Sequence, residues 1–254
     1  MRYSDIIADL SRRAGALMLA LAMLLFCAPA LADEDDAEEC APPFALLTLV
    51  NRWNSLDPEC EPVLADIGDG HEIDARAALD FERMMNACRA AGLRPVVRSS
   101  YRTWNKQTSL YENKVRRVRR VGTPAHLARM ESATVVAYPG TSEHQLGLAL
   151  DIVDRDYQAL DTEQENTPVQ KWLMENSWKY GFILRYPSDK CARTGIIYEP
   201  WHYRYVGMAA AREIYESGLC FEEYVYEHFA PELGQVPLEL HTLCHIYVPI
   251  SSRF

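Results

Sequence analysis

Residues 142–151, Ser-Glu-His-Gln-Leu-Gly-Leu-Ala-Leu-Asp, are the stretch from which the fold of this chain can be predicted. A second motif, Glu-Pro-Trp-His, follows fifty residues later at 199–202. Apolar residues follow Gly147 without a break, so we expect a strand that carries Asp151 on the face away from its leucines. Gly147 lets the chain fold back, which brings the imidazole of His144 toward this carboxylate. The two segments together offer two imidazoles and two carboxylates.

The second segment, residues 199–202, is also expected to lead into a strand. Its proline biases Glu199 away from helix, and residues 201–206 alternate like another strand. Zinc held for catalysis usually takes three nitrogen or oxygen ligands and keeps a fourth position for water. His144, Asp151 and His202 fit that count. Glu199 is then left for proton transfer.

The joint pattern S-x-H-x-x-G-x-A-x-D followed by E-P-W-H resembles the VanY-type zinc D-alanyl-D-alanine carboxypeptidases, a family that trims peptidoglycan stem peptides. The resemblance runs from about Leu49 to Tyr224. Further segments in the family's order support it: Leu49–Arg52, Ser100–Arg102, Gln107, Gly181–Pro187 and Trp201–Gly207.

The resemblance implies Zn²⁺ as the cofactor. It implies that His144, Asp151 and His202 hold the metal and that Glu199 is the catalytic base. It also implies that Arg102 binds the substrate, peptidoglycan stem peptides. A protein with an intact set of these residues is expected to be a zinc metallopeptidase.

Arginine suits the position of Arg102 because its planar fork can hold a terminal carboxylate through two parallel hydrogen bonds. Ser100 and Thr103 replace the glycine and serine that the family shows more often around this arginine. Without the resemblance, a surface arginine is at least as good an interpretation. Gln107 and Ser142 could complete recognition of the peptide end, or equally cap local backbone.

The function that we expect is release of the C-terminal D-alanine from stem peptides. An L,D-carboxypeptidase acting on tetrapeptide stems is the alternative within the same class. From other classes we keep a noncatalytic zinc-containing cell-wall binding module and a disulfide-held envelope protein without metal. The chain has no H-E-x-x-H motif, which argues against a thermolysin-like peptidase.

The predicted fold is α+β, a small antiparallel sheet flanked by helices, and the resemblance implies the fold shared with the hedgehog signalling domain. The pattern predicts helices over 73–91, 105–120, 168–180, 208–216 and 221–229, a strand over 95–100, and a hairpin of 182–184 with 196–198 just before Glu199. Thr167 is expected to cap the helix that Pro168 begins.

Residues 1–32 have the layout of a cleavable secretory signal, with an apolar run from Ala14 to Ala28 and cleavage expected after Ala32. An uncut membrane anchor and a lipoprotein modified at Cys27 are the less favoured alternatives. We expect an acidic linker over 33–43, a zinc carboxypeptidase domain over 44–229 and a tail over 230–254.

Removing the leader takes away three basic and two acidic residues, so the formal net charge moves from −10 to −11. This acidic balance argues against nucleic acid as a partner. It favours a protein exported across the inner membrane to the periplasm, without stable membrane insertion after cleavage. Five cations near the end of the helix over 105–120 could meet an anionic polymer, although a solvated helix face explains them as well.

Six cysteines remain after the leader, an even number that suggests disulfides in an exported chain, one of which could tether the tail. A buried free thiol is the alternative for each. The six are Cys40, Cys60, Cys88, Cys191, Cys220 and Cys244.

Overall fold

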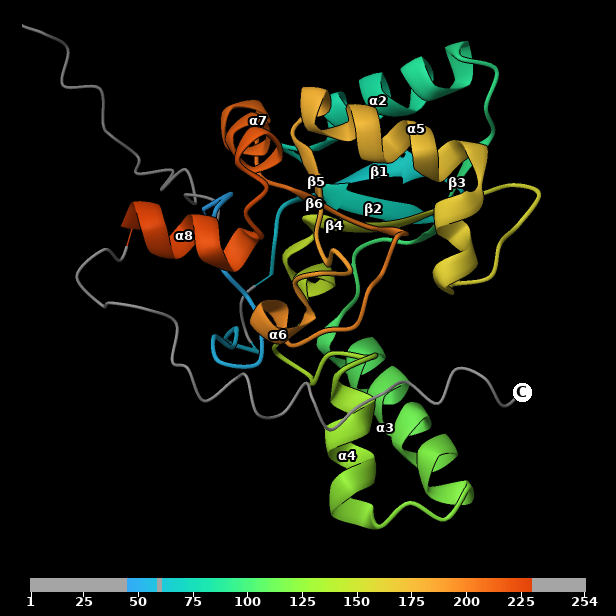
Figure 1. Cartoon of the computed structure of the whole chain (residues 1–254), viewed down its shortest axis with the longest axis vertical. Coiled ribbons are helices and arrows are strands. Elements are labelled where there is room, and N and C mark those ends of the chain that lie inside the picture. The colour runs from blue at the N-terminus through green and yellow to red at the C-terminus, as the bar shows by residue number, and fades with distance from the viewer. Residues whose placement is uncertain (1–44, 59–60, 230–254) are drawn as a thin grey trace, which may run out of the picture. The chain divides into compact units, whose positions relative to one another are not determined.

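Both motif segments lead into the central strands of a four-stranded antiparallel sheet in the computed structural model, which describes residues 45–58 and 61–229 (Figure 1). The strand order is β3 (Pro95–Ser99), β4 (Ala149–Asp154), β6 (His202–Tyr205) and β5 (Phe182–Leu184). A separate two-stranded hairpin pairs β1 (Leu64–Gly68) with β2 (His71–Asp74). These strands and the helices around them confirm the α+β class.

Two helices, α2 (Ala78–Ala90) and α5 (Pro168–Asn176), cover one face of the four-stranded sheet, and Figure 1 shows them lying together above the strands. Their apolar sides pack with the sheet in the main core cluster. The residues that share this cluster include Phe81, Met84, Leu150, Ile152, Leu173, Phe182, Tyr203 and Tyr205. The other face of the sheet is therefore left for polar side chains.

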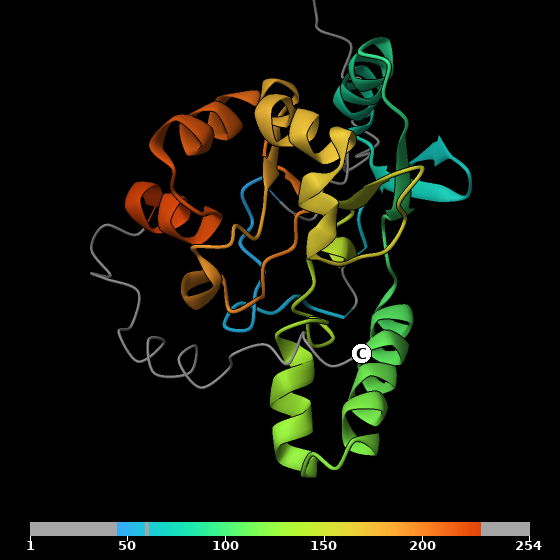
Figure 2. The same cartoon turned by 45° about the vertical axis from the view of Figure 1, so that its right-hand side comes forward.

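Helices α3 (Trp104–Arg120) and α4 (Ala125–Ala133) form an antiparallel pair that extends away from the sheet (Figure 2). They pack on each other through Tyr111, Val115 and Ala128. The arginines near the end of α3 are exposed, so they line the solvated side of this helix.

A third cluster joins β5 to the last two helices, α7 (Met208–Ser217) and α8 (Phe221–Phe229). Ile183, Ile214 and Phe221 are buried there. No helix within the described residues is long and apolar enough to span a membrane.

The cap expected on α5 is confirmed: the side chain of Thr167 accepts a hydrogen bond from the Gln170 backbone N, and Pro168 is the first helical residue. After Asn176 the chain continues as the 3₁₀ turn η3 (Ser177–Tyr180). This turn ends at Gly181, which has φ 82°. A Cβ at Gly181 would lie 2.7 Å from a ring carbon of Tyr205. Both the backbone conformation and the close approach of β6 therefore favour glycine here.

The predicted helix over 73–91 is wrong at its start, because residues 71–74 form β2 and the helix begins at Ala78. Ile73 pairs with Ala65 of β1 and is fully buried, so its place in an apolar stripe reflects strand pairing. Apolar runs of this length fit either element, and pairing with a neighbouring strand decides between them.

The predicted hairpin of 182–184 with 196–198 is also wrong. Residues 191–194 form the short helix α6 (Cys191–Thr194), and Ile197 N donates to Thr134 O at the end of α4 instead of to β5. β5 pairs with β6, with Phe182 opposite Tyr205. Glu199 therefore lies in the loop that precedes β6.

Cys88 and Cys220 are buried free thiols, which corrects the expected disulfide pairing for these two. Cys40, Cys60 and Cys244 lie outside the described residues, as do the expected signal segment, the linker over 33–43 and the tail over 230–254.

Candidate active site

Asp151 of β4 and His202 of β6 are directly opposite each other in the strand register. Opposed residues of an antiparallel pair place their side chains on the same face. Since Leu150 and Ile152 pack into the core under α2 and α5, Asp151 and His202 project from the other face. Both are nevertheless buried.

His144 reaches the same place from the 3₁₀ turn η1 (Glu143–Leu146), which ends at Gly147 with φ 70°. Its Nδ1 lies 2.8 Å from the carbonyl oxygen of Ser100. A carbonyl only accepts, so Nδ1 carries the proton and the lone pair of His144 is on Nε2. The Arg102 backbone N donates to His144 O at 3.0 Å and ties the turn to the chain after β3.

Asp151 Oδ1 lies 3.3 Å from His144 Nε2 and 3.2 Å from His202 Nδ1. One ligand atom from each of the three residues lies within 4.8 Å of the others. Asp151 Oδ1 is buried, and no hydrogen-bond partner for it is found among the described residues. An unsatisfied buried carboxylate oxygen between two imidazole nitrogens is costly unless a cation joins them, and two nitrogens with one oxygen suit zinc.

The charge states of the three residues are strongly perturbed. Burial lowers the pKa of His144 to about 4, with help from the nearby Arg102 cation, so its imidazole is neutral. Burial opposes the charge on Asp151, but the neighbouring imidazoles and Arg102 outweigh it and hold the pKa of that carboxyl well below its usual range. Burial opposes the charge on His202 too, but the nearby carboxylates of Asp151 and Glu143 raise its pKa to about 9.

Glu199 lies beside this cluster, with its Oε2 3.5 Å from His202 Nδ1. Its backbone N donates to Tyr186 O at 3.2 Å, and its O accepts from His202 N at 3.1 Å. These bonds fix the backbone of Glu199 just before β6. Burial, the largest cause, raises the pKa of Glu199 to about 8, and the charge of Asp151 adds to the effect.

Arg102 contacts the cluster directly. Its Nη2 donates to Asp151 Oδ2 at 2.9 Å and lies 2.9 Å from His144 Nε2. Its Nε donates to Ser99 Oγ at 2.8 Å, and its Nη1 donates to Gln107 Oε1 at 3.1 Å. The guanidinium is thus held by four neighbours.

Gln107 and Ser142, the two residues predicted to complete recognition of the peptide end, are both buried. Gln107 is fully buried on α3, and its Nε2 donates to Ala137 O at 2.7 Å, so it holds Arg102. Ser142 is buried at the start of η1, and its side chain makes no capping bond to that turn.

Sequence reasoning missed Glu143, whose side chain is fully buried on the far side of His202. Its Oε1 accepts from Arg185 Nε at 2.7 Å and from Arg204 Nη1 at 2.8 Å. Burial opposes the charge on Glu143, but the two arginines and His202 hold its pKa well below the usual range. The signal lay in the adjacent motif histidine and in two arginines within otherwise apolar strand segments, but glutamates beside a motif are mostly solvated.

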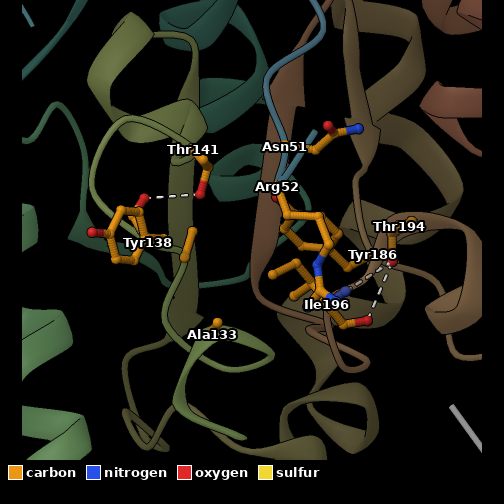
Figure 3. A pocket seen from close by; sticks show the side chains of 9 residues that line it. Asn51, Arg52, Ala133, Tyr138, Thr141, Tyr186, Thr194 and Ile196 are labelled. Carbon is orange, nitrogen blue, oxygen red and sulfur yellow. Dashed lines mark hydrogen bonds between the residues drawn. The ribbon is translucent and has the colours of Figure 1, made fainter. Parts of the chain in front are cut away.

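Figure 3 shows a pocket beside the cluster, lined by side chains from three parts of the chain. Asn51 and Arg52 come from the segment before β1, Tyr138 and Thr141 precede η1, and Tyr186 follows β5. Further lining residues are Ala133, Ala137, Thr194 and Ile196. The rings of Tyr186 and His202 are 4.8 Å apart between centroids, so the pocket adjoins the metal-binding candidates.

Known proteins similar to this chain indicate its family. Residues 70–208 match the family described as VanY, D-alanyl-D-alanine carboxypeptidase. A D-alanyl-D-alanine carboxypeptidase of Enterococcus faecalis (strain ATCC 700802 / V583) is 45% identical over 179 residues, which cover 70% of this chain and 65% of that relative's own length.

Two solved structures are similar over almost their whole length. One is VanYB in complex with D-alanine-D-alanine, with 44% identity, a TM-score of 0.66, and coverage of 72% of this chain and 98% of that chain. The other is a mutant of the vancomycin resistance D,D-pentapeptidase VanY from the VanB-type cassette, in complex with Zn(II). It has 44% identity, a TM-score of 0.64, and coverage of 70% and 98%.

Proposed function

The chain belongs to the VanY family of D-alanyl-D-alanine carboxypeptidases, and we propose that it is a zinc-dependent enzyme that removes the C-terminal D-alanine from peptidoglycan stem peptides. The observation that carries this proposal is that His144 Nε2 and His202 Nδ1 lie 3.3 and 3.2 Å from Asp151 Oδ1, in a cluster that could hold a metal ion. Glu199 Oε2 lies 3.5 Å from His202 Nδ1 and Arg102 Nη2 lies 2.9 Å from Asp151 Oδ2, which supports roles in proton transfer and substrate binding.

His144, Asp151 and His202 would hold the zinc. The unsatisfied Asp151 Oδ1 and the lone pair of His144 Nε2 both point into the cluster. When bound there, zinc lowers the pKa of water to about 7 and polarises the scissile carbonyl.

Glu199 is proposed as the general base. It takes a proton from the attacking water and passes it to the nitrogen of the departing D-alanine, so one carboxyl group serves both steps. Its pKa of about 8 in the metal-free protein lies near neutral pH, where proton transfer in both directions is efficient.

Arg102 is proposed to bind the carboxylate of the terminal D-alanine. Its Nη2 now lies 2.9 Å from the lone pair of His144 that zinc would use. Gln107 accepts from Nη1 of this guanidinium and Ser99 accepts from its Nε, so both hold it in place. Holding the carboxylate limits hydrolysis to the last peptide bond.

The test is amino-acid release by the purified protein from a synthetic pentapeptide stem ending in D-Ala-D-Ala and from the corresponding tetrapeptide. Release of D-alanine from the pentapeptide is expected, with loss of activity in chelator and recovery with Zn²⁺. Glu199→Gln should lower kcat by about 10²–10⁴-fold, whereas Glu216→Gln, the same change at an exposed position of α7, should leave it unaltered.

Release from the tetrapeptide instead would move the assignment to the L,D-carboxypeptidase. A protein that binds one zinc but releases no amino acid from either peptide would refute catalysis and support the binding module.

We also propose that residues 1–32 direct export and are removed, which would bring the enzyme to its periplasmic substrate. The apolar run before Ala32 and the acidic residues after it support this. Amino-terminal sequencing of the protein from the periplasmic fraction should begin at Asp33. A chain that begins at Met1 and stays with the membrane would support the anchor.

A further inference from the structure

The second ring nitrogen of His202 faces Glu143. His202 Nε2 lies 3.7 Å from Glu143 Oε2, and both atoms are buried without a hydrogen bond to any other group in the described part of the chain. The pair lies on the opposite side of the imidazole from Nδ1, which faces Asp151. The Nδ1 edge of the ring therefore points toward the proposed metal site, and the Nε2 edge points toward a buried carboxylate.

The orientation of Glu143 is fixed by its other oxygen. Both Arg185 Nε and Arg204 Nη1 donate to Oε1, at 2.7 and 2.8 Å. All three side chains are fully buried. Because Oε1 takes both guanidinium bonds, Oε2 is the oxygen left to face His202.

The two arginines are themselves anchored. Arg185 makes a bidentate pair with Glu222 of α8, at 2.7 and 2.6 Å. Arg204 Nη2 donates to Leu46 O and Thr48 O, both at 2.9 Å. Four elements distant in sequence thus hold one carboxylate in one orientation. Burying these charges has a desolvation cost that stability alone does not require.

We propose, building on the zinc site proposed above, that Glu143 is a positioning residue that accepts the Nε2–H of His202 and so keeps the lone pair of this imidazole on Nδ1. A neutral imidazole has one N–H and one lone pair, and the group that accepts the N–H decides which nitrogen binds metal. Outer carboxylates of this kind typically raise metal affinity by about 10–100-fold.

Glu143→Gln tests the proposal sharply. The two arginines must still donate to the amide oxygen, so the amide NH₂ turns toward His202 Nε2 and donates where the carboxylate accepted. That bond favours the tautomer with the proton on Nδ1, which opposes metal binding. We expect zinc affinity, measured by competition with a chromophoric chelator, to fall by about 10–100-fold.

Glu222→Gln is the matched control, because it removes the same charge from the same Arg185 without touching His202. Its zinc affinity should stay within about threefold of wild type, while both variants lose similar stability in urea without metal. Equal loss of zinc affinity in the two variants would overturn the proposal and show a general effect of the buried charges.

Glu143→Asp decides the question if Glu143→Gln does not fold. It keeps the charge between the arginines but withdraws the carboxylate from His202 by one methylene, so a smaller loss of zinc affinity is expected. The His202 Nε2–H proton signal of the zinc-loaded protein should move upfield relative to wild type. Wild-type affinity with an unmoved signal would refute the role of Glu143.

The wild-type titration separates the two proposals. Failure of wild type to bind one zinc per chain would refute the proposed function, whereas tight binding by wild type and by every Glu143 variant would refute the positioning role alone.

Discussion

Arg102 Nη2 lies 2.9 Å from Asp151 Oδ2, so the cation proposed to hold the substrate also contacts a proposed metal ligand. Replacing it with Met removes the hold on the peptide carboxylate and, at the same time, a positive charge that repels zinc. We expect Arg102→Met to raise KM for the pentapeptide by roughly 100-fold, the value of about two charge-assisted hydrogen bonds. Zinc affinity should be equal to that of wild type or tighter.

Arg98→Met is the control for Arg102, since Arg98 is exposed on the same strand, β3. It should change neither quantity. An Arg102 variant that loses zinc while keeping its KM would show that the guanidinium serves the metal cluster and not the substrate.

Asp151→Asn removes the anionic ligand between the two imidazoles. The zinc affinity should fall by more than the roughly 100-fold typical of an outer carboxylate, and activity should vanish at low micromolar zinc. Asp154→Asn makes the same change three residues later on β4, at a buried carboxylate that accepts from the Asp156 backbone N. Metal analysis after gel filtration should find one zinc per chain in this control and none in Asp151→Asn.

The raised pKa of Glu199 predicts how the stability of the metal-free protein depends on pH. The folded chain keeps a proton on this carboxyl up to about pH 8, whereas the unfolded chain releases it near pH 4.3. The stabilising contribution is therefore complete below about pH 4.3 and is lost as the pH rises through 8. Glu199→Gln cannot lose this proton.

The free energy of unfolding of Glu199→Gln minus that of wild type should thus grow between pH 5 and pH 8, by at least the roughly 1.4 kcal/mol of one pKa unit, and then level off. Urea denaturation in chelator at several pH values measures it. A difference that stays flat or shrinks with pH would contradict the buried, protonated state of Glu199.

Gly181→Ala tests the junction between η3 and β5. The new Cβ would lie 2.7 Å from the Tyr205 ring, at φ 82°. We expect a loss of about 2–5 kcal/mol in the free energy of unfolding, from overpacking and backbone strain together. Gly218→Ala shares the positive φ but meets nothing within 4 Å, so it should lose only the backbone part. Equal losses would mean that the close contact contributes nothing.

Local patterns predicted the elements that carry the motif. The strand with Asp151, the strand with His202 and the capped start of α5 all follow from residues close together in the sequence, because alternation and capping are local. The candidate zinc ligands could be selected for the same reason, as they stand in two short segments.

Long-range pairing could not be predicted in this way. Ile73 belongs to a strand because β1 lies beside it, and Ile197 bonds to Thr134 because α4 ends there. The role proposed for Glu143 depends on Arg185, which directly follows β5, and on Arg204 of β6. A charged residue next to a motif has no local pattern that distinguishes burial from solvation, so its partners must be seen in space.

The two arginines are anchored by residues outside the region that the family matches. The region matched by the family runs from residue 70 to 208, yet Arg204 bonds to Leu46 and Thr48, and Arg185 pairs with Glu222. A fragment limited to the matched region would leave both guanidiniums without these acceptors, beside the carboxylate of Glu143. We therefore expect such a fragment to be less stable than one that includes residues 46–222, because the outermost segments satisfy buried charges at the centre of the fold.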